Sequence, residues 1–316
     1  MKSALIVGSG GQDGRLLTSL LLSREYHVVG IERGALRANG RADGAPVNIL
    51  NRDQISQLVG DLRPSEIYYL AAFHHSSEEP LRDDRQHFQR SYDTHVQGLI
   101  NVLEAVKDKS PESRVFYAAS SHVFGHPEVD LQDEQTPLNP TCIYGITKTA
   151  GIHCCRFYRN AHGVHASAGI LYNHESQYRK KIFVSQKIIS GAMDIKKKMS
   201  DKLVLGSLSA AVDWGYAPDY VDAMTRVVSL PKPEDFVIAT GQAHSVLDFV
   251  KAAFGPLGLD WRQYVEERPG IITKRKSNLV GNAAKLRTMT DWQPSVTFEQ
   301  MVQQLLPSDG IACEAR

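Results

Sequence analysis

Short apolar runs alternate with longer amphipathic segments through the first half of the chain. The apolar runs have the length of buried strands and predict strands at 4–7, 27–31, 67–70, 114–118 and 166–171. The amphipathic segments predict helices at 15–23, 54–62, 87–107 and 144–160. This alternation is typical of the α/β class. It predicts a Rossmann-type, doubly wound parallel sheet with helices on both faces.

The second half of the chain is less regular, and proline and glycine interrupt it near 231–234 and 268–270. A length of 316 residues exceeds the usual size of one hydrophobic core, so two lobes are expected. We assign residues 1–169 and about 210–240 to the Rossmann domain. Residues from about 170 to 209 and from 241 to 316 are assigned to a smaller α/β lobe that binds the substrate.

Composition argues against several classes of partner. Hydrophobic residues make up 42% of the chain, charged residues 22%, and the formal net charge is +1. This balance gives no electrostatic basis for binding nucleic acid or an anionic membrane. No stretch approaches the ~18 consecutive apolar residues of a membrane helix, and the apolar run at the N-terminus is too short for a signal peptide. We therefore expect a cytoplasmic protein.

The cysteines and histidines predict no metal site. The four cysteines are Cys142, Cys154, Cys155 and Cys313. Their spacing fits neither a zinc site nor a disulfide framework, so reduced thiols are expected. The adjacent His74 and His75 point apart if they end a strand, and no carboxylate lies at ligand spacing from them or from His122. Structural or substrate-lining histidines are the expectation.

A glycine-rich turn follows the first predicted strand and opens a helix. Gly8, Gly11 and Gly14 form a G-x-x-G-x-x-G pattern, with Gln12 and Asp13 inside it. Glycine lets backbone N–H groups approach a pyrophosphate, and the N-terminus of the helix adds a partial positive charge for that anion. Because a strand precedes the pattern and an amphipathic helix follows it, we predict a dinucleotide-binding loop.

The end of the second predicted strand carries Glu32 and Arg33. An acid roughly 20 residues after the glycines usually binds the hydroxyls of the adenosine ribose and repels a 2′-phosphate. Glu32 therefore favours NAD. Arg33 could pair with a 2′-phosphate, so NADP stays open as the alternative.

A Y-x-x-x-K motif at the start of a helix places Tyr144 and Lys148 on one helical face. The ammonium of Lys148 is expected to stabilise a tyrosinate and to lower the pKa of Tyr144 from about 10 towards neutrality. Such a phenolate can accept the proton of a substrate hydroxyl while hydride leaves for a nicotinamide. A preceding strand ends in Ser120 and Ser121, either of which could hydrogen-bond the same hydroxyl.

The order of glycine loop, serine-bearing strand and Tyr–Lys helix resembles that of the extended short-chain dehydrogenases/reductases. Within that superfamily the chain is most similar to the GDP-mannose 4,6-dehydratases. The resemblance covers nearly the whole chain, and the segments 173–176 (Asn-His-Glu-Ser) and 213–215 (Asp-Trp-Gly) are specific to this branch. Further similar segments are 8–14, 70–72 with His75, 169–172, 205–206, 219–221, 238–241 and 244–246.

The resemblance implies an NAD(P)-dependent enzyme that acts on a nucleotide-diphosphate sugar, with a GDP-sugar favoured. The sugar C4 hydroxyl is oxidised, the C5 proton is removed, water leaves from C6, and hydride returns. Tyr144 and Lys148 match the family's Tyr and Lys, and Ser120 matches its Thr. Cofactor contacts are implied for Gly8, Gly11, Gln12, Asp13, Gly14, Glu32, Arg33, Asn48, Ala71, Ala72, Tyr144 and Lys148. Substrate contacts are implied for His75, Asn173, Glu175 and Ser176. Further candidates are Ser121 for the substrate hydroxyl and Arg179, Lys187 and Arg268 for the diphosphate.

The chain departs from the family pattern at the base for the C5 proton. The dehydratases carry a glutamate two residues after the active Thr, and His122 stands at that position here. Either His122 is inert and the enzyme only oxidises or reduces C4, or its imidazole replaces the carboxylate. If a base acts at C5 and no acid protonates the C6 oxygen, the enzyme would be an epimerase that uses His122 or Cys142. The residue at position 122 therefore leaves three alternatives: full dehydration, oxidation or reduction of C4 alone, and epimerisation.

The substrate side departs from the family as well. Val212 and Gln186 stand where the family has basic residues, and Asn48 replaces an adenine-contacting Asp. The sugar and the nucleotide therefore stay open. The helices at 87–107 and 144–160 often pair across a twofold axis in this superfamily, so a homodimer is expected, with a tetramer as the alternative. A non-catalytic NAD(P)-binding scaffold is the competing hypothesis, and the intact Ser120, Tyr144 and Lys148 argue against it.

Overall fold

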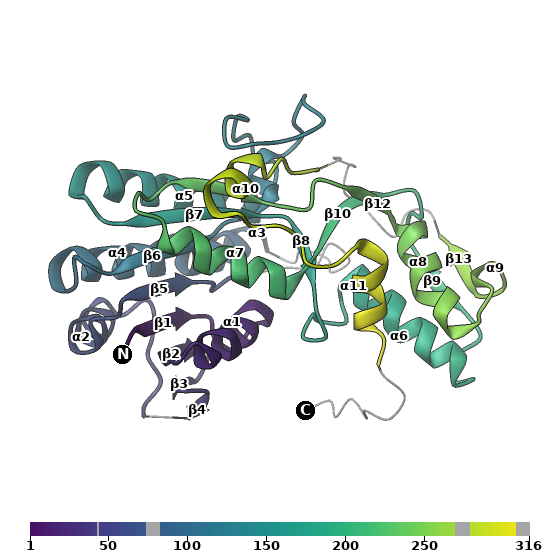
Figure 1. The fold of residues 1–316 in the computed structure, drawn as a ribbon, viewed down its shortest axis with the longest axis horizontal. Coiled ribbons are helices and arrows are strands. Elements are labelled where there is room, and N and C mark those ends of the chain that lie inside the picture. The colour runs from purple at the N-terminus through teal and green to yellow at the C-terminus, as the bar shows by residue number, and fades with distance from the viewer. Residues whose placement is uncertain (43, 74–82, 269–278, 308–316) are drawn as a thin grey trace.

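The computed structural model describes residues 1–42, 44–73, 83–268 and 279–307. These residues form two lobes that lie side by side along the longest axis of the molecule (Figure 1). The larger lobe contains the N-terminus and a broad central sheet. The smaller lobe is built from the second half of the chain.

The described part of the larger lobe contains one eight-stranded sheet. Its order is β11 (Asp235–Ile238), β7 (Ala166–Leu171), β6 (Arg114–Ala118), β5 (Glu66–Tyr69), β1 (Ser3–Val7), β2 (His27–Glu32), β3 (Ala35–Ala38) and β4 (Arg41–Ala42). The pairs from β11 to β2 are all parallel. The predicted Rossmann-type parallel sheet is confirmed. The chain passes from β1 to β2 on one side and returns to β5 on the other, which makes the carboxyl ends of β1 and β5 a topological switch point.

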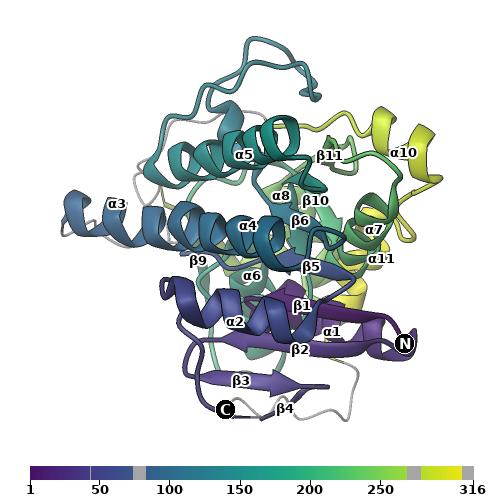
Figure 2. The same cartoon turned by 90° about the vertical axis from the view of Figure 1, so that its left-hand side faces the viewer.

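Helices cover both faces of this sheet. On one face α2 (Arg52–Leu62), α4 (Gly98–Lys109) and α5 (Ile143–His162) are stacked side by side (Figure 2). On the other face α1 (Gln12–Ser23) packs against α7 (Ala217–Ser229). The parallel strands are therefore buried on both sides, which explains their continuous apolar sequences.

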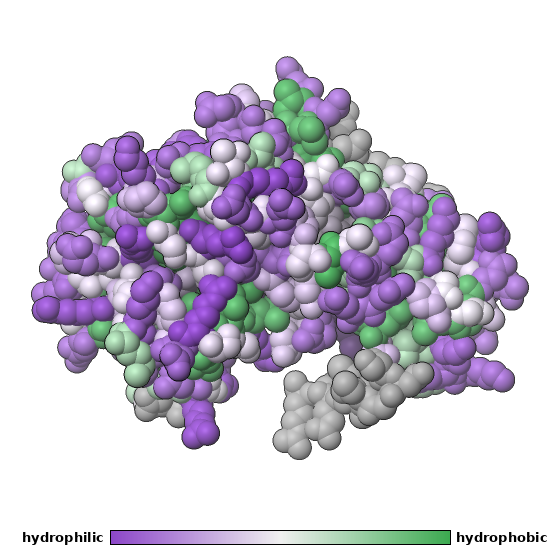
Figure 3. Space-filling model, in the orientation of Figure 1, coloured by the Kyte–Doolittle hydropathy of each residue, from purple (hydrophilic) through white to green (hydrophobic). Residues whose placement is uncertain are grey.

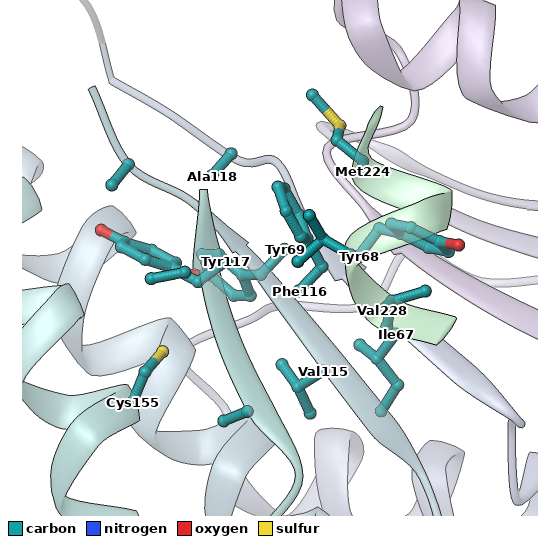
Figure 4. Packing of buried hydrophobic residues seen from close by; sticks show 14 of the residues in the cluster. Ile67, Tyr68, Tyr69, Val115, Phe116, Tyr117, Ala118, Cys155, Met224 and Val228 are labelled. Carbon is teal, nitrogen blue, oxygen red and sulfur yellow. The ribbon is translucent and has the colours of Figure 1, made fainter. Parts of the chain in front are cut away.

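The core follows the two-residue period of the strands. Tyr68 on β5 and Phe116 on β6 lie on the side of the sheet where α7 contributes Met224 (Figure 4). Tyr117, the next residue on β6, lies on the opposite side, towards Cys155 of α5. All five side chains are fully buried. The sheet is thus fixed between the two helical layers, and its carboxyl edge is held rigidly.

The antiparallel extension of the sheet was not predicted. β2, β3 and β4 form a meander with tight two-residue turns, the second of which is Asn39-Gly40. Both turn residues have positive φ, 48° at Asn39 and 80° at Gly40. Asn-Gly favours this conformation and is a strong hairpin sequence. The meander places Arg37 opposite Gly30, close to the end of β2.

The single long helix predicted at 87–107 is interrupted. The structure has α3 (Asp84–Tyr92), then a π-helical turn η1 (Asp93–Gln97), and then α4. The helix begins three residues earlier than predicted because Asp83 caps its N-terminus, accepting hydrogen bonds from the N–H groups of Arg85 and Gln86. A π turn inserts one residue, so it changes which side chains face the core.

The described part of the smaller lobe contains two short sheets and several helices. A three-stranded sheet has the order β12 (Ala243–Ser245), β10 (Ala211–Tyr216) and β8 (Asn173–Glu175), and a two-stranded sheet pairs β13 (Val265–Glu267) with β9 (Leu203–Leu205). The helices are α6 (Val184–Lys196), α8 (Val246–Phe254), α9 (Trp261–Tyr264) and α11 (Phe298–Leu305). A separate apolar cluster around Trp214, Phe249 and Phe298 forms its core.

Two segments belong to a different lobe from the one to which the sequence assigned them. The strand β10 falls within the stretch 210–240 assigned to the Rossmann domain, but it pairs in the three-stranded sheet. The helix α10 (Ala284–Thr290) falls within 241–316, but its Leu286 joins the core of the larger lobe. The chain crosses between the lobes more often than periodicity could indicate, because sheet membership depends on long-range pairing.

The surface seen in Figure 3 is mainly polar, and its apolar side chains form small, separate patches. Within the described residues, no helix combines the length and the apolar character needed to span a membrane.

Candidate active site

The glycine loop lies at the switch point of the sheet. The N–H groups of Gly8 and Ser9 donate to the carbonyl of Ile31 at 2.8 and 3.1 Å, which turns the chain away from β1. Gly8 has a φ of 98°, and a Cβ there would lie 2.7 Å from the backbone nitrogen of Ala71. Only glycine fits this position. The loop therefore lies directly against the segment that follows β5.

The start of α1 has the features of a pyrophosphate cradle. Its N-cap residue is Gly11, which has no side chain that could accept a hydrogen bond from the first N–H groups of the helix. A Cβ on Gly14 would lie 2.4 Å from the carbonyl oxygen of Gly8, so the helix can approach the loop only with glycine here. The N–H groups of the first helical turn and the positive end of the helix dipole are thus available to an anion. These residues fit the diphosphate of a dinucleotide.

The acid at the end of β2 is paired with an arginine that sequence analysis did not single out. Arg37 of β3 donates through Nε to Oε1 of Glu32. The Glu32 carboxylate lies against Gly10, where a Cβ would be 2.4 Å from Oε2. Arg33, the predicted candidate, occupies the tight turn and is exposed. The Asn48 side chain accepts a hydrogen bond from the N–H of Leu50 at 3.0 Å and so shapes the turn before α2.

Tyr144 and Lys148 lie in the first turns of α5. The N–H of Gly145 donates to Sγ of Cys142, which caps the helix at 3.4 Å. Lys148 is 1% exposed, and its Nζ donates to the carbonyl of Ala118 at the end of β6 at 2.7 Å. Nζ lies 5.8 Å from the centroid of the Tyr144 ring. The helix therefore presents both groups at the carboxyl edge of the sheet.

The predicted lowering of the Tyr144 pKa is wrong for this structure. Burial raises the pKa of Tyr144, and the charge of Arg179 opposes this shift only in part. Burial also lowers the pKa of Lys148 to about 7. The Lys148 ammonium donates to the Ala118 carbonyl, and desolvation is the largest cause of both pKa shifts. Asp13, which raises the pKa of both groups, links them to the glycine loop electrostatically.

The segment after β6 brings Ser120 and His122 to the same place. Ser120 caps a short 3-10 helix, η2 (Ser121–Phe124), and its Oγ accepts a hydrogen bond from the N–H of His122 at 3.4 Å. The His122 ring meets the Tyr144 ring edge-on, with centroids 5.9 Å apart. Ser121 is buried at 4% exposure. Ser120, His122, Tyr144 and Lys148 therefore form one cluster.

Gln12 and Asp13 tie the glycine loop to the segment around β8. Nε2 of His174 lies 3.0 Å from both carboxylate oxygens of Asp13. Gln12 donates to the carbonyl of His174 at 3.1 Å and accepts from Ser176 Oγ at 3.0 Å. The His174 ring stacks on Tyr220 with centroids 4.5 Å apart. We name the residues Gln12, Asp13, His174 and Ser176 the loop clasp.

The loop clasp predicts a pH window for stability. Although burial opposes it, the charge of Asp13 raises the pKa of His174 above 6.5. Burial acts to raise the pKa of Asp13, but the charge and hydrogen bond of His174 lower it below 3.8. The His174 contribution is complete below about pH 6.5 and is lost as the pH rises through the raised value. The Asp13 contribution is complete above about pH 4 and is lost as the pH falls through the lowered value.

We therefore expect His174→Gln to destabilise the protein most between about pH 4 and pH 6.5, by about 1.5–3 kcal/mol. The difference in unfolding free energy from the wild type, measured in urea across this range, should shrink above pH 8. A difference that grows between pH 6.5 and pH 9 would contradict the ion pair.

Glu175 and Arg179, two other predicted substrate residues, form an ion pair with each other. Glu175 is 1% exposed; it accepts a hydrogen bond from Ser185 Oγ at 2.6 Å and pairs with Arg179 Nε at 3.4 Å. The Arg179 guanidinium lies over the Phe183 ring at 3.7 Å. Glu175 thus positions Arg179, whose charge reaches both Tyr144 and Asp13.

The remaining predicted substrate residues are less clustered. Asn173 pairs with Trp214 in the three-stranded sheet. Lys187 lies in the first turns of α6, and Arg268 is exposed after β13. His75 and its neighbour His74 lie outside the described residues. Among the described residues, no group of three or more His, Cys, Asp or Glu side chains is arranged to hold a metal ion.

Sequence analysis missed His95. This residue is fully buried in the π turn, and its ring meets the Tyr144 ring edge-on at a centroid distance of 5.1 Å. Its position four residues before the apolar Leu99, in the helix predicted at 87–107, could have indicated that it faces the sheet.

Solved structures share the fold of this chain. The dTDP-glucose 4,6-dehydratase from Bacillus anthracis, solved with NAD, superposes with a TM-score of 0.81 at 20% identity, over 96% of this chain and 95% of that one. The UDP-glucose 4-epimerase from Thermus thermophilus, also with NAD, gives 0.80 at 18% identity, over 96% and 97%. The fold is that of the extended short-chain dehydrogenases/reductases.

Sequence comparison is more specific. A model of the GDP-mannose 4,6 dehydratase family matches residues 5–305. GDP-mannose 4,6 dehydratase 2 from Arabidopsis thaliana is 35% identical over 98% of this chain and 87% of its own length. GDP-mannose 4,6 dehydratase 2 from Caenorhabditis elegans is 33% identical over 99% and 90%. The chain belongs to the GDP-mannose 4,6-dehydratase family of nucleotide-sugar enzymes.

Proposed function

We propose that this protein binds NAD and a nucleotide-diphosphate sugar and that it oxidises or reduces C4 of the sugar, with Tyr144 as the acid and base. The observation that carries the proposal is the cluster of Ser120, Tyr144 and Lys148 at the carboxyl edge of β6. Lys148 is anchored to this edge through the Ala118 carbonyl at 2.7 Å. The glycine loop lies at the carboxyl end of β1, which β5 separates from β6, and Asp13 brings it within electrostatic reach of the cluster. A hydroxyl and a hydride acceptor can therefore meet at one point.

The cofactor assignment rests on the loop and on Glu32. When bound, the dinucleotide supplies a nicotinamide that accepts or returns hydride. Gly8, Gly11 and Gly14 would hold its diphosphate, and Glu32 would accept hydrogen bonds from the adenosine ribose. Relatives in fold were solved with NAD, and a neighbour described as RMD from Pseudomonas aeruginosa was solved with NADPH. The carboxylate at Glu32 favours NAD, while Arg37 beside it keeps NADP as the alternative.

Tyr144 is suited to hold and move the proton of the C4 hydroxyl. Burial keeps the phenol protonated, which is the form that donates to a C4 ketone in the reductive direction. In the oxidative direction the phenol must ionise, and the cationic forms of Lys148 and of the nicotinamide would stabilise the phenolate. Ser120 would hydrogen-bond the same hydroxyl and so orient it.

His122 decides between the possible products. Its ring lies against Tyr144, where the family carries a glutamate as the base for the C5 proton. We propose a 4-dehydrogenase or 4-ketoreductase without elimination as the principal activity. Epimerisation through His122 or Cys142 is the alternative, because the Cys142 thiol also lies at the start of α5.

The proposal is tested by analysing products from a panel of nucleotide sugars, with GDP-mannose first. Net reduced nicotinamide indicates a 4-dehydrogenase, a product lighter by one water indicates a dehydratase, and solvent deuterium uptake at unchanged formula indicates an epimerase. We expect His122→Glu to create or enhance loss of water, since it restores the carboxylate. A variant that binds the sugar with unchanged affinity and forms no dehydrated product would show that the carboxylate is not the only missing group.

We also infer a homodimer formed by the helices on one face of the larger lobe, with a tetramer as the alternative. Phe88 and Tyr92 on α3, and Ile146 and Phe157 on α5, are apolar side chains with 38–58% exposure. Paired apolar helical faces of this kind suit an interface with a second copy. Sedimentation at assay concentration should give twice the mass of one chain, and a monomer would contradict this inference.

The compartment is proposed from the cysteines. Cys142, Cys154 and Cys155 are free thiols, as expected in the reducing cytoplasm. Cell fractionation tests this assignment, and recovery in an oxidising compartment would contradict it.

A further inference from the structure

His95 is held at a site that the proposed chemistry does not yet use. It lies in the π turn η1, where the N–H of Gly98 bonds to the carbonyl of Asp93, five residues earlier. The carbonyl of Thr94 therefore loses its usual α-helical donor. Tyr69 of β5 replaces that donor, since its hydroxyl bonds to the Thr94 carbonyl at 2.5 Å. The π turn is thus fixed by the sheet, and such turns often occur at functional sites.

The helix lies unusually close to β5 at this point. A Cβ on Gly98 would lie 2.3 Å from the Tyr69 hydroxyl oxygen, so a larger residue would push the helix away from the sheet. This approach places His95 beneath the start of α5, with 0% of its surface exposed. A buried imidazole must have its hydrogen bonds satisfied, and the partners of His95 come from two other segments.

The first partner is the segment after β5 and the second is α5. The backbone N–H of Phe73 donates to Nε2 of His95 at 2.9 Å. Because Nε2 is an acceptor, Nδ1 carries the proton and donates to Oγ1 of Thr147 at 2.8 Å. Thr147 in turn donates to the carbonyl of Ile143 at 3.0 Å. One imidazole therefore joins the segment after β5, which flanks the glycine loop, to the helix that carries the phenol.

The same ring also contacts Tyr144 itself. The His95 and Tyr144 rings are perpendicular, at 88°, with centroids 5.1 Å apart. His122 meets Tyr144 at 88° as well, at 5.9 Å. Edge-to-face contacts of this kind restrict the plane of a ring. The orientation of the phenol is therefore set by two imidazoles.

We propose that His95 is a positioning residue, which sets the distance between the phenol of Tyr144 and the cofactor-binding segment after β5 by linking Phe73 to Thr147. This inference rests on the proposed function, because the proposed function makes Tyr144 the acid and base and places the cofactor at the glycine loop. His95 acts through its neighbours and takes no proton from the substrate. Misplacement of reacting groups by about 1 Å can cost on the order of 100-fold in rate.

Three variants separate the two hydrogen bonds. His95→Gln places an amide oxygen near Nε2 and keeps the acceptor for Phe73. His95→Leu removes both bonds and keeps much of the volume. Thr147→Val keeps the acceptor for Phe73 and removes the acceptor of Nδ1, together with the bonds from Thr147 Oγ1 to carbonyls of its own helix. The side chain keeps nearly the same shape, and this variant serves if His95→Leu does not fold. The matched control is His165→Gln, the same change at a residue just before β7, at the amino ends of the parallel strands.

We expect His95→Leu to lower kcat roughly 100-fold with the KM for the nucleotide sugar within about 3-fold of wild type. His95→Gln should recover most of that loss, and Thr147→Val should lower kcat about 10-fold. Amide hydrogen exchange gives a readout without turnover: the Phe73 N–H should exchange faster in His95→Leu and stay protected in His95→Gln. The His165→Gln control should match the wild type.

Wild-type kcat in His95→Leu or in Thr147→Val, or equal loss in the Gln and Leu variants, would overturn the positioning role. Failure of the proposed function looks different. In that case the wild type turns over no nucleotide sugar, while the exchange of the Phe73 N–H still responds to His95→Leu.

Discussion

Tyr144→Phe should lower kcat for C4 oxidation or reduction by about 10²–10⁴-fold, with the KM for the nucleotide sugar changed by less than about 3-fold. The substitution removes only the phenolic oxygen, so the ring still packs between His95 and His122. In the proposed mechanism the lost oxygen is the group that exchanges a proton with the C4 hydroxyl in the transition state. Steady-state kinetics with the best substrate of the panel measures both constants.

Tyr117→Phe is the matched control for this experiment. Tyr117 lies on β6, is fully buried, and within the described residues its hydroxyl has no hydrogen-bond partner. Removing that hydroxyl should leave kcat within about 3-fold of wild type and should not lower the unfolding free energy. If Tyr144→Phe retained a tenth or more of the wild-type rate, the phenol would not be the acid and base.

Lys148→Met should separate activity from stability. We expect kcat to fall about 10²–10³-fold, because the phenolate loses the only cation on its own helical face within one turn. At the same time the folded state should become more stable at pH 6. Lys148 is 1% exposed, and burial lowers its pKa to about 7. Burying this lysine in its protonated form therefore costs a few kcal/mol, which is about the free energy that corresponds to its pKa shift.

The pH dependence gives the sign of this effect. Between about pH 7 and pH 10.5 the unfolded chain binds the lysine proton and the folded chain does not, so wild-type stability rises with pH in this range. The stability gain of Lys148→Met should therefore be largest below pH 7 and should shrink towards pH 10. Lys202→Met, at a half-exposed surface pair with Glu266, is the control and should show no such trend. A variant that is less stable than wild type at pH 6 would contradict the desolvated ammonium.

Much of the fold followed from local sequence patterns. The buried strands and the glycine turn are short-range features, since apolar runs and glycines at fixed spacing report on backbone geometry directly. The meander after β2 was also within reach. Asn39-Gly40 is a strong hairpin sequence, but the half-buried β3 lacks the apolar–polar alternation that would have indicated a strand.

The electrostatics of the site could not be predicted from spacing. The Y-x-x-x-K pattern places Tyr144 and Lys148 on one face, but it does not show how deeply both are buried or that the Ala118 carbonyl binds the ammonium. Desolvation therefore reversed the expected shift of the Tyr144 pKa. Arg37 and His174 were missed for a related reason, because each meets its partner through strand pairing or crossing between distant segments.

Label transfer from the sugar tests the central claim most directly. Protein loaded with NAD is mixed with GDP-mannose deuterated at C4, and then with C4-deuterated UDP- and dTDP-hexoses, and the recovered dinucleotide and sugar are analysed by mass spectrometry. With at least one sugar, deuterium should leave C4 and appear on the dinucleotide or at C6 of a dehydrated product, and Tyr144→Phe should abolish the transfer. Retention of all deuterium at C4 with every sugar and with no epimerised product, at concentrations where the sugar binds, would contradict an enzyme that begins its chemistry at that carbon.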